Sequence, residues 1–360
     1  MTPLADILRR RIAAEGPLTV ADFMTAALLH PEHGYYIRQD PFGADGDFVT
    51  APEVSQMFGE LIGLWCVAAW QQMGSPEAVN LVELGPGRGT LMSDALRAAR
   101  MVPEFIAAAS VHLVDASPVL RDIQRFKLSG QRVAWHEGLD GVPDGPLILI
   151  ANEFFDALPI RQIVRGEAAW HERLISWEDE KFAFVLDQAP SPLAHLLPEP
   201  LRRDAPRFSL IELAPAVIGT AKAIADRVGR DGGAALIIDY GHSATAPGET
   251  LQAVRRHRSV DVLVEPGNAD ITAHVDFAAI GRAVSPSAKL HGPIGQGVFL
   301  RRLGIDVRRE TLCAGADPTA REQIDAAYAR LTAPDEMGKL FKAVAVTRHD
   351  APAPAGFEVE

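Results

Sequence analysis

The stretch that decides the fold is Val82-Glu83-Leu84-Gly85-Pro86-Gly87-Arg88-Gly89-Thr90, in which an apolar run leads into three spaced glycines. Residues 80–84 have the pattern of a buried strand, and helical periodicity follows from 90 to 99. Glycine lets the backbone approach a ligand closely, and the N-terminus of a helix offers free N–H groups. This order of strand, turn and helix therefore predicts an α/β sheet with a nucleotide-like ligand at the turn.

The segments that follow this turn repeat the alternation of strand and helix. Strands are predicted at 110–115, 132–136, 146–152 and 234–239, and helices at 118–128 and 216–228. Near-continuous apolar runs separated by helices indicate parallel strands that are buried on both faces. The predicted fold class is α/β, with a doubly wound, Rossmann-like sheet.

The rest of the chain surrounds this core. Short antiparallel strands are predicted at 162–164, 172–175 and 182–185, and the C-terminal third shows strands at 250–254 and 343–347 and helices at 277–284 and 318–331. We expect an N-terminal helical region with a lid loop at 1–75, the core at 76–160 and 207–350, an inserted substrate-side region of antiparallel strands and helix at 161–206, and a flexible tail at 351–360.

Composition excludes several classes of protein. The 360 residues carry 35 Lys and Arg against 47 Asp and Glu, a net charge of -12, which argues against nucleic acid as the partner. Two cysteines, Cys66 and Cys313, are too few for a disulfide framework or a thiolate metal cage and favour a reducing compartment. No apolar run reaches the roughly 18 residues of a membrane span, and 1–16 lacks the pattern of a secretory signal or a transit peptide. We expect a cytoplasmic protein without membrane insertion.

The spacing of the glycines indicates the kind of ligand. Glycines at 85, 87 and 89 differ from the G-x-G-x-x-G dinucleotide fingerprint, and no lysine follows as in a phosphate-binding loop. An acidic residue just before the glycines, here Glu83, is the pattern of S-adenosylmethionine enzymes, and Asp115 at the end of the next strand is placed to accept hydrogen bonds from ribose. The alternative is a tight turn that only packs helix on sheet. The residues expected to bind the cofactor are Glu83, Gly85, Pro86, Gly87, Gly89, Asp115, Ala116, His136 and Asn152.

Some of these residues have a second interpretation. His136 ends the third strand and is either a wall of an adenine pocket or a plain strand terminus. Asn152, Glu153 and Asp156 follow the fourth strand, where a transferred group would lie, and are the expected catalytic residues. In the alternative, Asn152 caps a helix and the two acids are solvated.

Further polar residues lie at a later strand and in the C-terminal third. Asp239 ends that strand and could equally accept hydrogen bonds from nearby backbone N–H groups. His274 and Asp276 have no partners at the spacing of a metal site, so no metal is assigned.

The motifs together resemble the MidA-like class I methyltransferases, whose mitochondrial members are protein arginine methyltransferases that assist assembly of respiratory complex I. The matching motifs, in chain order, are 30–36, 46–53, 83–89, 152–159, 238–241, 270–277 and 296–300. The resemblance implies a seven-stranded class I sheet, S-adenosylmethionine as donor and symmetric dimethylation of an arginine. Residues expected at the substrate side or in the lid are Tyr35, Tyr36, Gly46, Asp47, Thr50, Pro52, Glu53, Asp239, Tyr240 and His274.

The function expected from these observations is S-adenosylmethionine-dependent methylation of a protein, on an arginine of a complex I subunit or an equivalent protein. The expected partner is that protein substrate, and a homodimer stays open. The resemblance implies a mitochondrial matrix location for eukaryotic relatives and the cytoplasm for a bacterial one. Two other classes are alternatives: a non-catalytic assembly factor that keeps the fold, and a nicotinamide-dependent oxidoreductase, which the glycine spacing disfavours.

Overall fold

The computed structural model describes residues 2–38 and 49–358 and divides the chain into two units. The first unit is built from residues 1–48, 156–219 and 244–276. The second is built from residues 49–155, 220–243 and 277–360. Each unit therefore combines three separate segments of the sequence.

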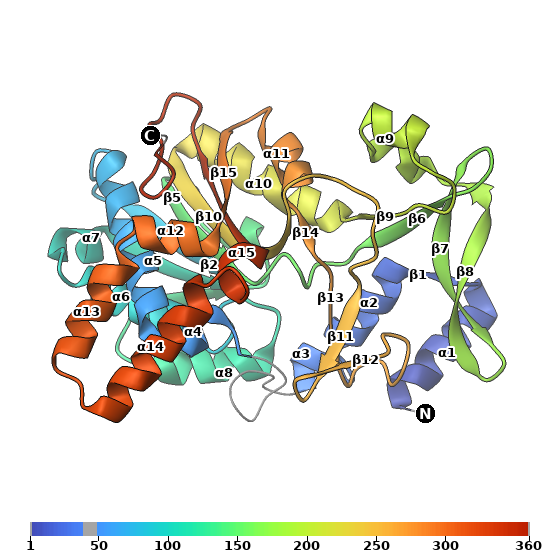
Figure 1. The fold of residues 1–360 in the computed structure, drawn as a ribbon, viewed down its shortest axis with the longest axis horizontal. Helices are drawn as coiled ribbons and strands as arrows, with labels where there is room; N and C mark the ends of the chain where they lie inside the picture. Colours follow the sequence, from blue (N-terminus) through green and yellow to red (C-terminus); the bar gives the residue numbers. More distant parts are fainter. Residues whose placement is uncertain (1, 39–48, 359–360) are drawn as a thin grey trace. The chain divides into compact units, whose positions relative to one another are not determined.

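The second unit contains the predicted α/β sheet, in the strand order β15-β16-β10-β5-β2-β3-β4. The strands are β2 (Val79–Leu84), β3 (Ala109–Val114), β4 (Val133–His136), β5 (Leu147–Asn152), β10 (Gly233–His242), β15 (Lys289–Gly295) and β16 (Phe341–Thr347). Figure 1 shows β2, β5 and β10 side by side, and the five strands from β10 to β4 are parallel. The carboxyl ends of these five strands therefore meet at one edge, where ligands bind in sheets of this kind.

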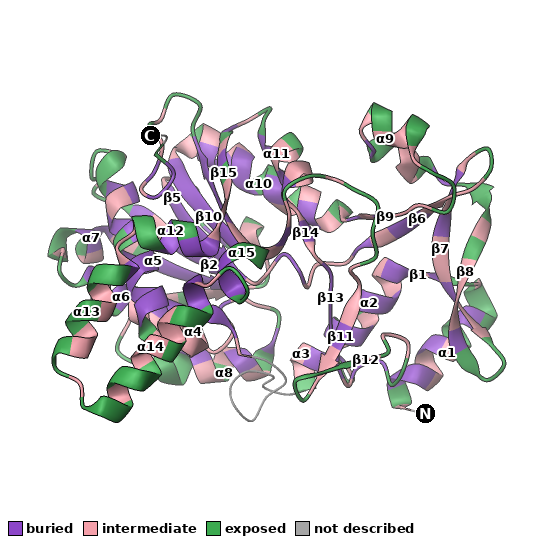
Figure 2. Ribbon diagram, viewed as in Figure 1, coloured by how far each residue is buried: buried purple, intermediate pink, exposed green. Residues whose placement is uncertain are grey.

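The second unit also contains helices, some of which pack on the sheet and others on neighbouring helices. They are α4 (Ala51–Val54), α5 (Gln56–Gln72), α6 (Thr90–Ala99), α7 (Pro103–Ala108), α8 (Pro118–Lys127), α11 (Phe277–Val284), α12 (Gln296–Arg302), α13 (Ile305–Ala314), α14 (Pro318–Thr332) and α15 (Met337–Leu340), with a 3-10 turn, η1, at Leu139–Gly141. In addition, α10 (Pro215–Asp231) contains the boundary between units at residue 219. The strands at the centre of the sheet are buried along most of their length (Figure 2), which confirms the prediction drawn from their continuous apolar runs.

Close packing of α5 on α6 depends on Gly63, because a Cβ there would clash with the carbonyl group of Ala95. The start of α8 is fixed by Ser117, whose side chain accepts a hydrogen bond from the backbone N–H of Leu120. The N-termini of α6 and α8 lie after the short turns that follow β2 and β3.

The C-terminal segment contains a core residue that its pattern did not predict. Phe357 is 5% exposed, and its ring lies 5.2 Å from the ring of Phe299. Arg302 donates a hydrogen bond to the carbonyl oxygen of Gly356 at 3.2 Å. The segment expected as a flexible tail, 351–360, thus contributes Phe357 to the core.

The first unit is mainly antiparallel. Its elements are α1 (Pro3–Glu15), β1 (Leu18–Thr19), α2 (Val20–Leu29), α3 (Tyr35–Arg38), β6 (Arg161–Arg165), β7 (Trp170–Glu178), β8 (Lys181–Pro190), η2 (Pro192–Leu196), α9 (Glu199–Asp204), β9 (Leu210–Leu213), β11 (Gln252–Arg255), β12 (Arg258–Val260), β13 (Asp270–Thr272) and β14 (Val275–Asp276). One sheet has the order β1-β7-β6-β9 with β8 on β7, and a second has the order β12-β11-β13. Its main core joins Leu4 and Phe23 from the N-terminal helices to Ile271 from β13.

Among the residues that the structure describes, none of the helices has both the length and the apolar character needed to cross a lipid bilayer.

Candidate functional site

The glycine-rich turn after β2 adopts a backbone that favours glycine. Gly85, Gly87 and Gly89 have φ angles of 62°, 51° and 77°, all in the left-handed region. A Cβ on Gly85 would lie 2.7 Å from Cδ2 of Phe154. Gly89 is also the N-cap of α6 and, having no side chain, makes no capping hydrogen bond to the N–H groups at the positive end of this helix. Pro86 is buried within the same turn.

Glu83 is a buried acid next to this turn. Its side chain is 3% exposed, and its Oε2 has no hydrogen-bond partner among the described residues. Burial and, to a smaller extent, the nearby charge of Asp115 raise the pKa of this carboxyl to about 8, although a hydrogen bond from the backbone N–H of Met92 acts in the opposite direction. An isolated buried carboxylate is costly, so the position suits a ligand that brings a positive charge.

Asp115 follows β3 and is held by two hydrogen bonds. Its Oδ1 accepts from the backbone N–H of Ser117 at 2.8 Å, and its Oδ2 accepts from Nε2 of Gln124 at 2.7 Å. Burial raises the pKa of Asp115, while Ser117, Gln124 and Arg121 act to lower it. Each carboxylate oxygen has capacity for a further hydrogen bond, which suits a ligand with hydroxyl groups. Ala116 is exposed beside it.

His136 ends β4 next to Asp115. Its carbonyl oxygen accepts from the Asp115 backbone N–H at 3.1 Å, and its Nε2 lies 2.9 Å from Nδ1 of His112. Burial lowers the pKa of both histidines, and the partner ring lowers that of His112 further. Nothing in the sequence pattern predicts this pairing of two rings.

Asn152 and Glu153 lie at the carboxyl end of β5, as predicted. Asn152 is 7% exposed, and its Oδ1 has no partner within the described part of the chain. Its Nδ2 donates to Oε1 of Glu153 at 3.2 Å. The alternative in which Asn152 caps a following helix is wrong, because residues 153–158 form bends and a turn.

Glu153 has an unusual backbone for a residue other than glycine, with φ at 49°. Its N–H donates to the carbonyl oxygen of Ile238 at 2.9 Å, and its Oε1 accepts from the backbone N–H of Ala51 at 2.8 Å. Ala51 is the first residue of α4, so this side chain binds the start of a short helix from a distant part of the sequence. Strained residues of this kind cluster at functional sites.

The predicted lid residues of the second unit lie in or next to α4. Thr50 is the N-cap of this helix and is 9% exposed, and Pro52 lies in its first turn. Glu53 accepts a hydrogen bond from the hydroxyl of Thr90, the first residue of α6. This segment therefore contacts the helix that follows the glycine-rich turn. Gly46 and Asp47, also predicted in the lid, lie outside the described residues.

Asp239 is fully buried at the end region of β10. Its Oδ2 accepts from the backbone N–H of Phe155 and its Oδ1 from that of Tyr240, both at 2.9 Å. These are the contacts expected if Asp239 accepts hydrogen bonds from nearby backbone N–H groups, the second of the two interpretations drawn from the sequence. The ring of Tyr240 packs on Phe341 with centroids 5.3 Å apart.

The remaining predicted residues belong to the first unit. Tyr35 is fully buried in α3, and the hydroxyl of the adjacent Tyr36 donates to Oδ1 of Asp270 at 2.8 Å. Burial raises the pKa of Tyr36 well above 10, and the charges of Asp270 and Asp156 raise it further. His274 uses its backbone N–H to bind the hydroxyl oxygen of Thr250 at 2.8 Å. The structure thus brings Tyr36 and Asp156 together around an acid, Asp270, that was not among the candidates.

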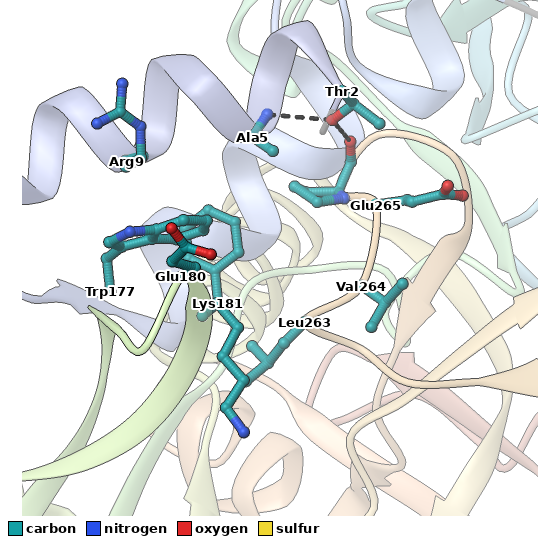
Figure 3. Close-up of a pocket in the computed structure, with 11 residues that line it drawn as sticks. Thr2, Ala5, Arg9, Trp177, Glu180, Lys181, Leu263, Val264 and Glu265 are labelled. Carbon is teal, nitrogen blue, oxygen red and sulfur yellow. Dashed lines mark hydrogen bonds between the residues drawn. The ribbon is translucent and has the colours of Figure 1, made fainter.

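A groove of about 590 Å³ on the first unit contains none of the predicted residues. It lies between α1, the β7–β8 turn and the loop after β12 (Figure 3). Thr2 forms part of its wall and donates to the carbonyl oxygen of Pro266 at 3.3 Å. The residues that line the groove include Arg9 and Lys181 as well as Glu180, so the lining does not favour either an anionic or a cationic ligand.

Gln124 is the residue of this region that the sequence analysis missed. It contacts both Asp115 and the glycine-rich turn. The spacing of apolar residues could have revealed it, because Gln124 follows the buried Leu120 by one helical turn and therefore lies on the buried face of α8.

Oε2 of Glu83 and Oδ1 of Asn152 are thus among the acceptor atoms of the second unit that are buried without a partner among the described residues. They lie at or near the carboxyl ends of neighbouring parallel strands, and the glycine-rich turn follows one of these strands. Buried acceptors that lack donors suit a ligand with N–H groups and positive charge. These acceptors fit the amino-acid end of a sulfonium nucleoside.

The comparisons with known proteins agree with this chemistry. A family model of S-adenosyl-L-methionine-dependent methyltransferases matches residues 61–294. The mitochondrial protein arginine methyltransferase NDUFAF7 of Xenopus laevis is 39% identical over 367 residues, which cover 94% of this chain and 83% of that protein. The human protein of the same name is 35% identical over 377 residues, which cover 97% and 84%.

A solved structure gives the same result for the fold. A superfamily member from Burkholderia thailandensis, crystallised with S-adenosyl-homocysteine, has a TM-score of 0.85 and 30% identity, and the match covers 98% of this chain and 94% of that one. The prediction of a class I methyltransferase fold is confirmed. The chain belongs to the family of S-adenosyl-L-methionine-dependent methyltransferases and takes S-adenosylmethionine as its cofactor.

Proposed function

We propose that this methyltransferase modifies an arginine side chain of a protein, either a subunit of respiratory complex I or an equivalent protein. The observation that carries the proposal is Glu153, a carboxylate held at the carboxyl end of β5 by Ala51 and Asn152. The names of the relatives, which are protein arginine methyltransferases, support arginine as the acceptor. The resemblance of the motifs supports complex I as the source of the substrate.

The cofactor side of the proposal uses residues of the second unit. Glu83 would bind the ammonium group of S-adenosylmethionine, the backbone of Gly85 and Gly87 its methionine end, and Asp115 the ribose hydroxyls. Pro86 and Gly89 would complete the turn, and Ala116 and His136 would lie beside the adenine. When bound, the cofactor supplies a methyl group on a positively charged sulfur.

The acceptor side uses carboxylates because the acceptor is a cation. A guanidinium has a pKa above 12, so it arrives protonated, and a carboxylate binds it in a planar, two-pronged arrangement. As the N–C bond forms and the S–C bond breaks, the guanidinium nitrogen gives up a proton. We assign Glu153 to orient the guanidinium and accept this proton, with Asn152 fixing the Glu153 side chain. Tyr240, in the same unit as Glu153, is assigned to the acceptor side, and roles there for Asp156, Tyr35, Tyr36 and His274 stay predictions from the sequence.

Location and assembly are part of the same proposal. The two cysteines are both free thiols, which agrees with a reducing compartment such as the bacterial cytoplasm. The protein substrate is the partner we propose, and a homodimer stays a prediction from the sequence.

The test separates transfer from cofactor binding. Purified protein and S-adenosylmethionine are incubated with an extract of cells that lack the gene, and methylarginine is measured by mass spectrometry. Glu153→Gln keeps an acceptor for the Ala51 N–H but removes the charge, so we expect an unchanged Kd for S-adenosylhomocysteine and a loss of transfer of about 100-fold, the usual scale for proton transfer by a side chain.

Glu137→Gln is the matched control. Glu137 also directly follows a parallel strand, β4, but its side chain is exposed. Transfer by this variant should equal that of the parent. Full transfer by Glu153→Gln would remove Glu153 from the reaction, and methylation of residues other than arginine by the parent would overturn the proposed acceptor.

A further inference from the structure

Helix α8 buries a polar side chain where an apolar one is expected. Its buried residues are Leu120 and Gln124, which lie one helical turn apart on the same face. Gln124 is fully buried. An amide removed from water costs free energy unless its donors and acceptors are satisfied, so a glutamine at this position needs specific partners.

Three hydrogen bonds satisfy the Gln124 amide. Its Nε2 donates to the carbonyl oxygen of Gly87 and to Oδ2 of Asp115, both at 2.7 Å. Its Oε1 accepts from Nε1 of Trp135 at 2.9 Å. An indole nitrogen only donates, so Trp135 fixes which end of the amide is the oxygen and directs both N–H groups to the other side.

The two acceptors of Gln124 come from different parts of the cofactor region. Asp115 follows β3, and Gly87 lies in the glycine-rich turn after β2. With Ser117 on Oδ1 and Gln124 on Oδ2, the plane of the Asp115 carboxylate is fixed. Because a peptide bond is planar and trans, holding the Gly87 carbonyl also fixes the direction of the N–H that follows it.

We propose that Gln124 is a positioning residue for S-adenosylmethionine, which sets the Asp115 carboxylate and the Gly87 peptide in one arrangement before the cofactor binds. The inference rests on the proposed role of Asp115 toward ribose. Gln124 acts through these two groups. Trp135 supports it by orienting the amide, and the aromatic ring of Trp135 lies under the guanidinium of Arg125 at 5.2 Å.

Two substitutions remove the N–H donors in different ways. Gln124→Met keeps the length of the side chain but makes no hydrogen bond to Asp115 or Gly87. Gln124→Glu keeps the shape, but an ionised carboxylate would face the Asp115 carboxylate and the Gly87 carbonyl, so it adds repulsion to the loss. We therefore expect glutamate to weaken cofactor binding more than methionine does.

The test is calorimetric titration with S-adenosylhomocysteine, which needs no acceptor protein. We expect Gln124→Met to raise the Kd at least tenfold and Gln124→Glu to raise it further at pH 8. Gln296→Met is the matched control, because Gln296 is also fully buried in this unit and its Nε2 donates to the carbonyl oxygen of Leu331. It should leave the Kd within twofold of the parent. An unchanged Kd in both Gln124 variants would overturn the inference.

A second variant keeps the test valid if Gln124→Met does not fold. Trp135→Phe changes a partly buried residue and leaves Gln124 in place without its orienting donor. A Kd raised threefold or more supports the inference, and an unchanged Kd contradicts it.

Asp115→Asn separates this inference from the proposed function. If Asp115→Asn leaves the Kd unchanged, the ribose assignment fails and the role of Gln124 fails with it. If Asp115→Asn weakens binding and the Gln124 variants do not, only the role of Gln124 is wrong. In the double variant, the Kd should rise by less than the product of the two single fold-changes, because Asp115 and Gln124 act in one network. A rise equal to that product would contradict the coupling.

Discussion

The sharpest prediction concerns the proton on Glu83. Its pKa of about 8, against a usual 4.5, means that the ligand-free protein carries a protonated Glu83 at neutral pH. At pH 7 about 0.9 of the molecules hold this proton, from the one-unit difference between pH and pKa. An ammonium group bound at Oε2 favours the charged carboxylate, so binding should release the proton.

The expected magnitude is about 0.9 proton released for each S-adenosylhomocysteine bound at pH 7, if the ligand lowers the pKa of Glu83 well below 7. The affinity should then rise with pH toward about 8 and level off there. The measurement is titration calorimetry at pH 7 in buffers of different ionisation enthalpy. Glu83→Gln cannot titrate, so it should release none of this proton and bind more weakly by about 1.5–3 kcal/mol, the scale of a hydrogen bond to a charged group.

The raised pKa of Glu83 also predicts how the stability of the ligand-free protein depends on pH. Because the folded pKa of Glu83 is raised, the folded protein binds more protons than the unfolded chain between pH 4.5 and about 8. Its contribution to the free energy of unfolding therefore falls as pH rises through this window, by up to about 1.4 kcal/mol per pH unit. Glu83→Gln should lose this slope. Equal proton release, or equal slopes, in parent and variant would refute the reasoning.

Three further predictions concern the turn and the core. Gly87→Val places a branched residue at φ 51°, which costs about 1–2 kcal/mol of strain for non-glycine residues, and cofactor binding measured by calorimetry should be abolished. The control is Gly130→Val, at φ 89° with nothing near its Cβ. Equal effects of the two variants on binding would contradict the assignment of the glycine-rich turn. Phe357→Ala should lower the free energy of unfolding by about 3 kcal/mol in denaturant titrations, and a loss below about 1 kcal/mol would contradict its packing. Asp239→Asn replaces one of the two carboxylate oxygens that accept from backbone N–H groups by an amide donor. It should cost about 1–3 kcal/mol of stability in the same titrations, whereas unchanged stability would argue against a structural role.

The sequence was sufficient for the parts of the fold that depend on local pattern. Strands such as β2 and β5 are buried on both faces, and their continuous apolar runs are visible without a structure. The position of polar residues at the ends of these strands follows from the parallel arrangement. That is why Glu83, Asp115 and Asn152 could be singled out before their contacts were known.

Other features depend on contacts between distant residues and leave little local signal. The strand β15 contains Gly292 and Pro293, and its pairing with β16 shifts between His291 and Ile294, so its pattern resembles a loop. A glutamine in a helix such as α8 is ordinary, and only the structure reveals what surrounds Gln124. The hydrogen bond from Ala51 to Glu153 joins residues about a hundred positions apart, which periodicity cannot detect.

The three-segment construction of the first unit has a consequence during synthesis. The apolar faces of α1 and α2, with Leu4 and Phe23, share one core with Ile271 and Ala273. At roughly 5–20 residues per second, the ribosome needs roughly 10–45 s to make the chain between residues 48 and 276, so these helices wait that long for the last of their partners. Until then, the nascent N-terminus exposes part of the apolar surface that this core later buries.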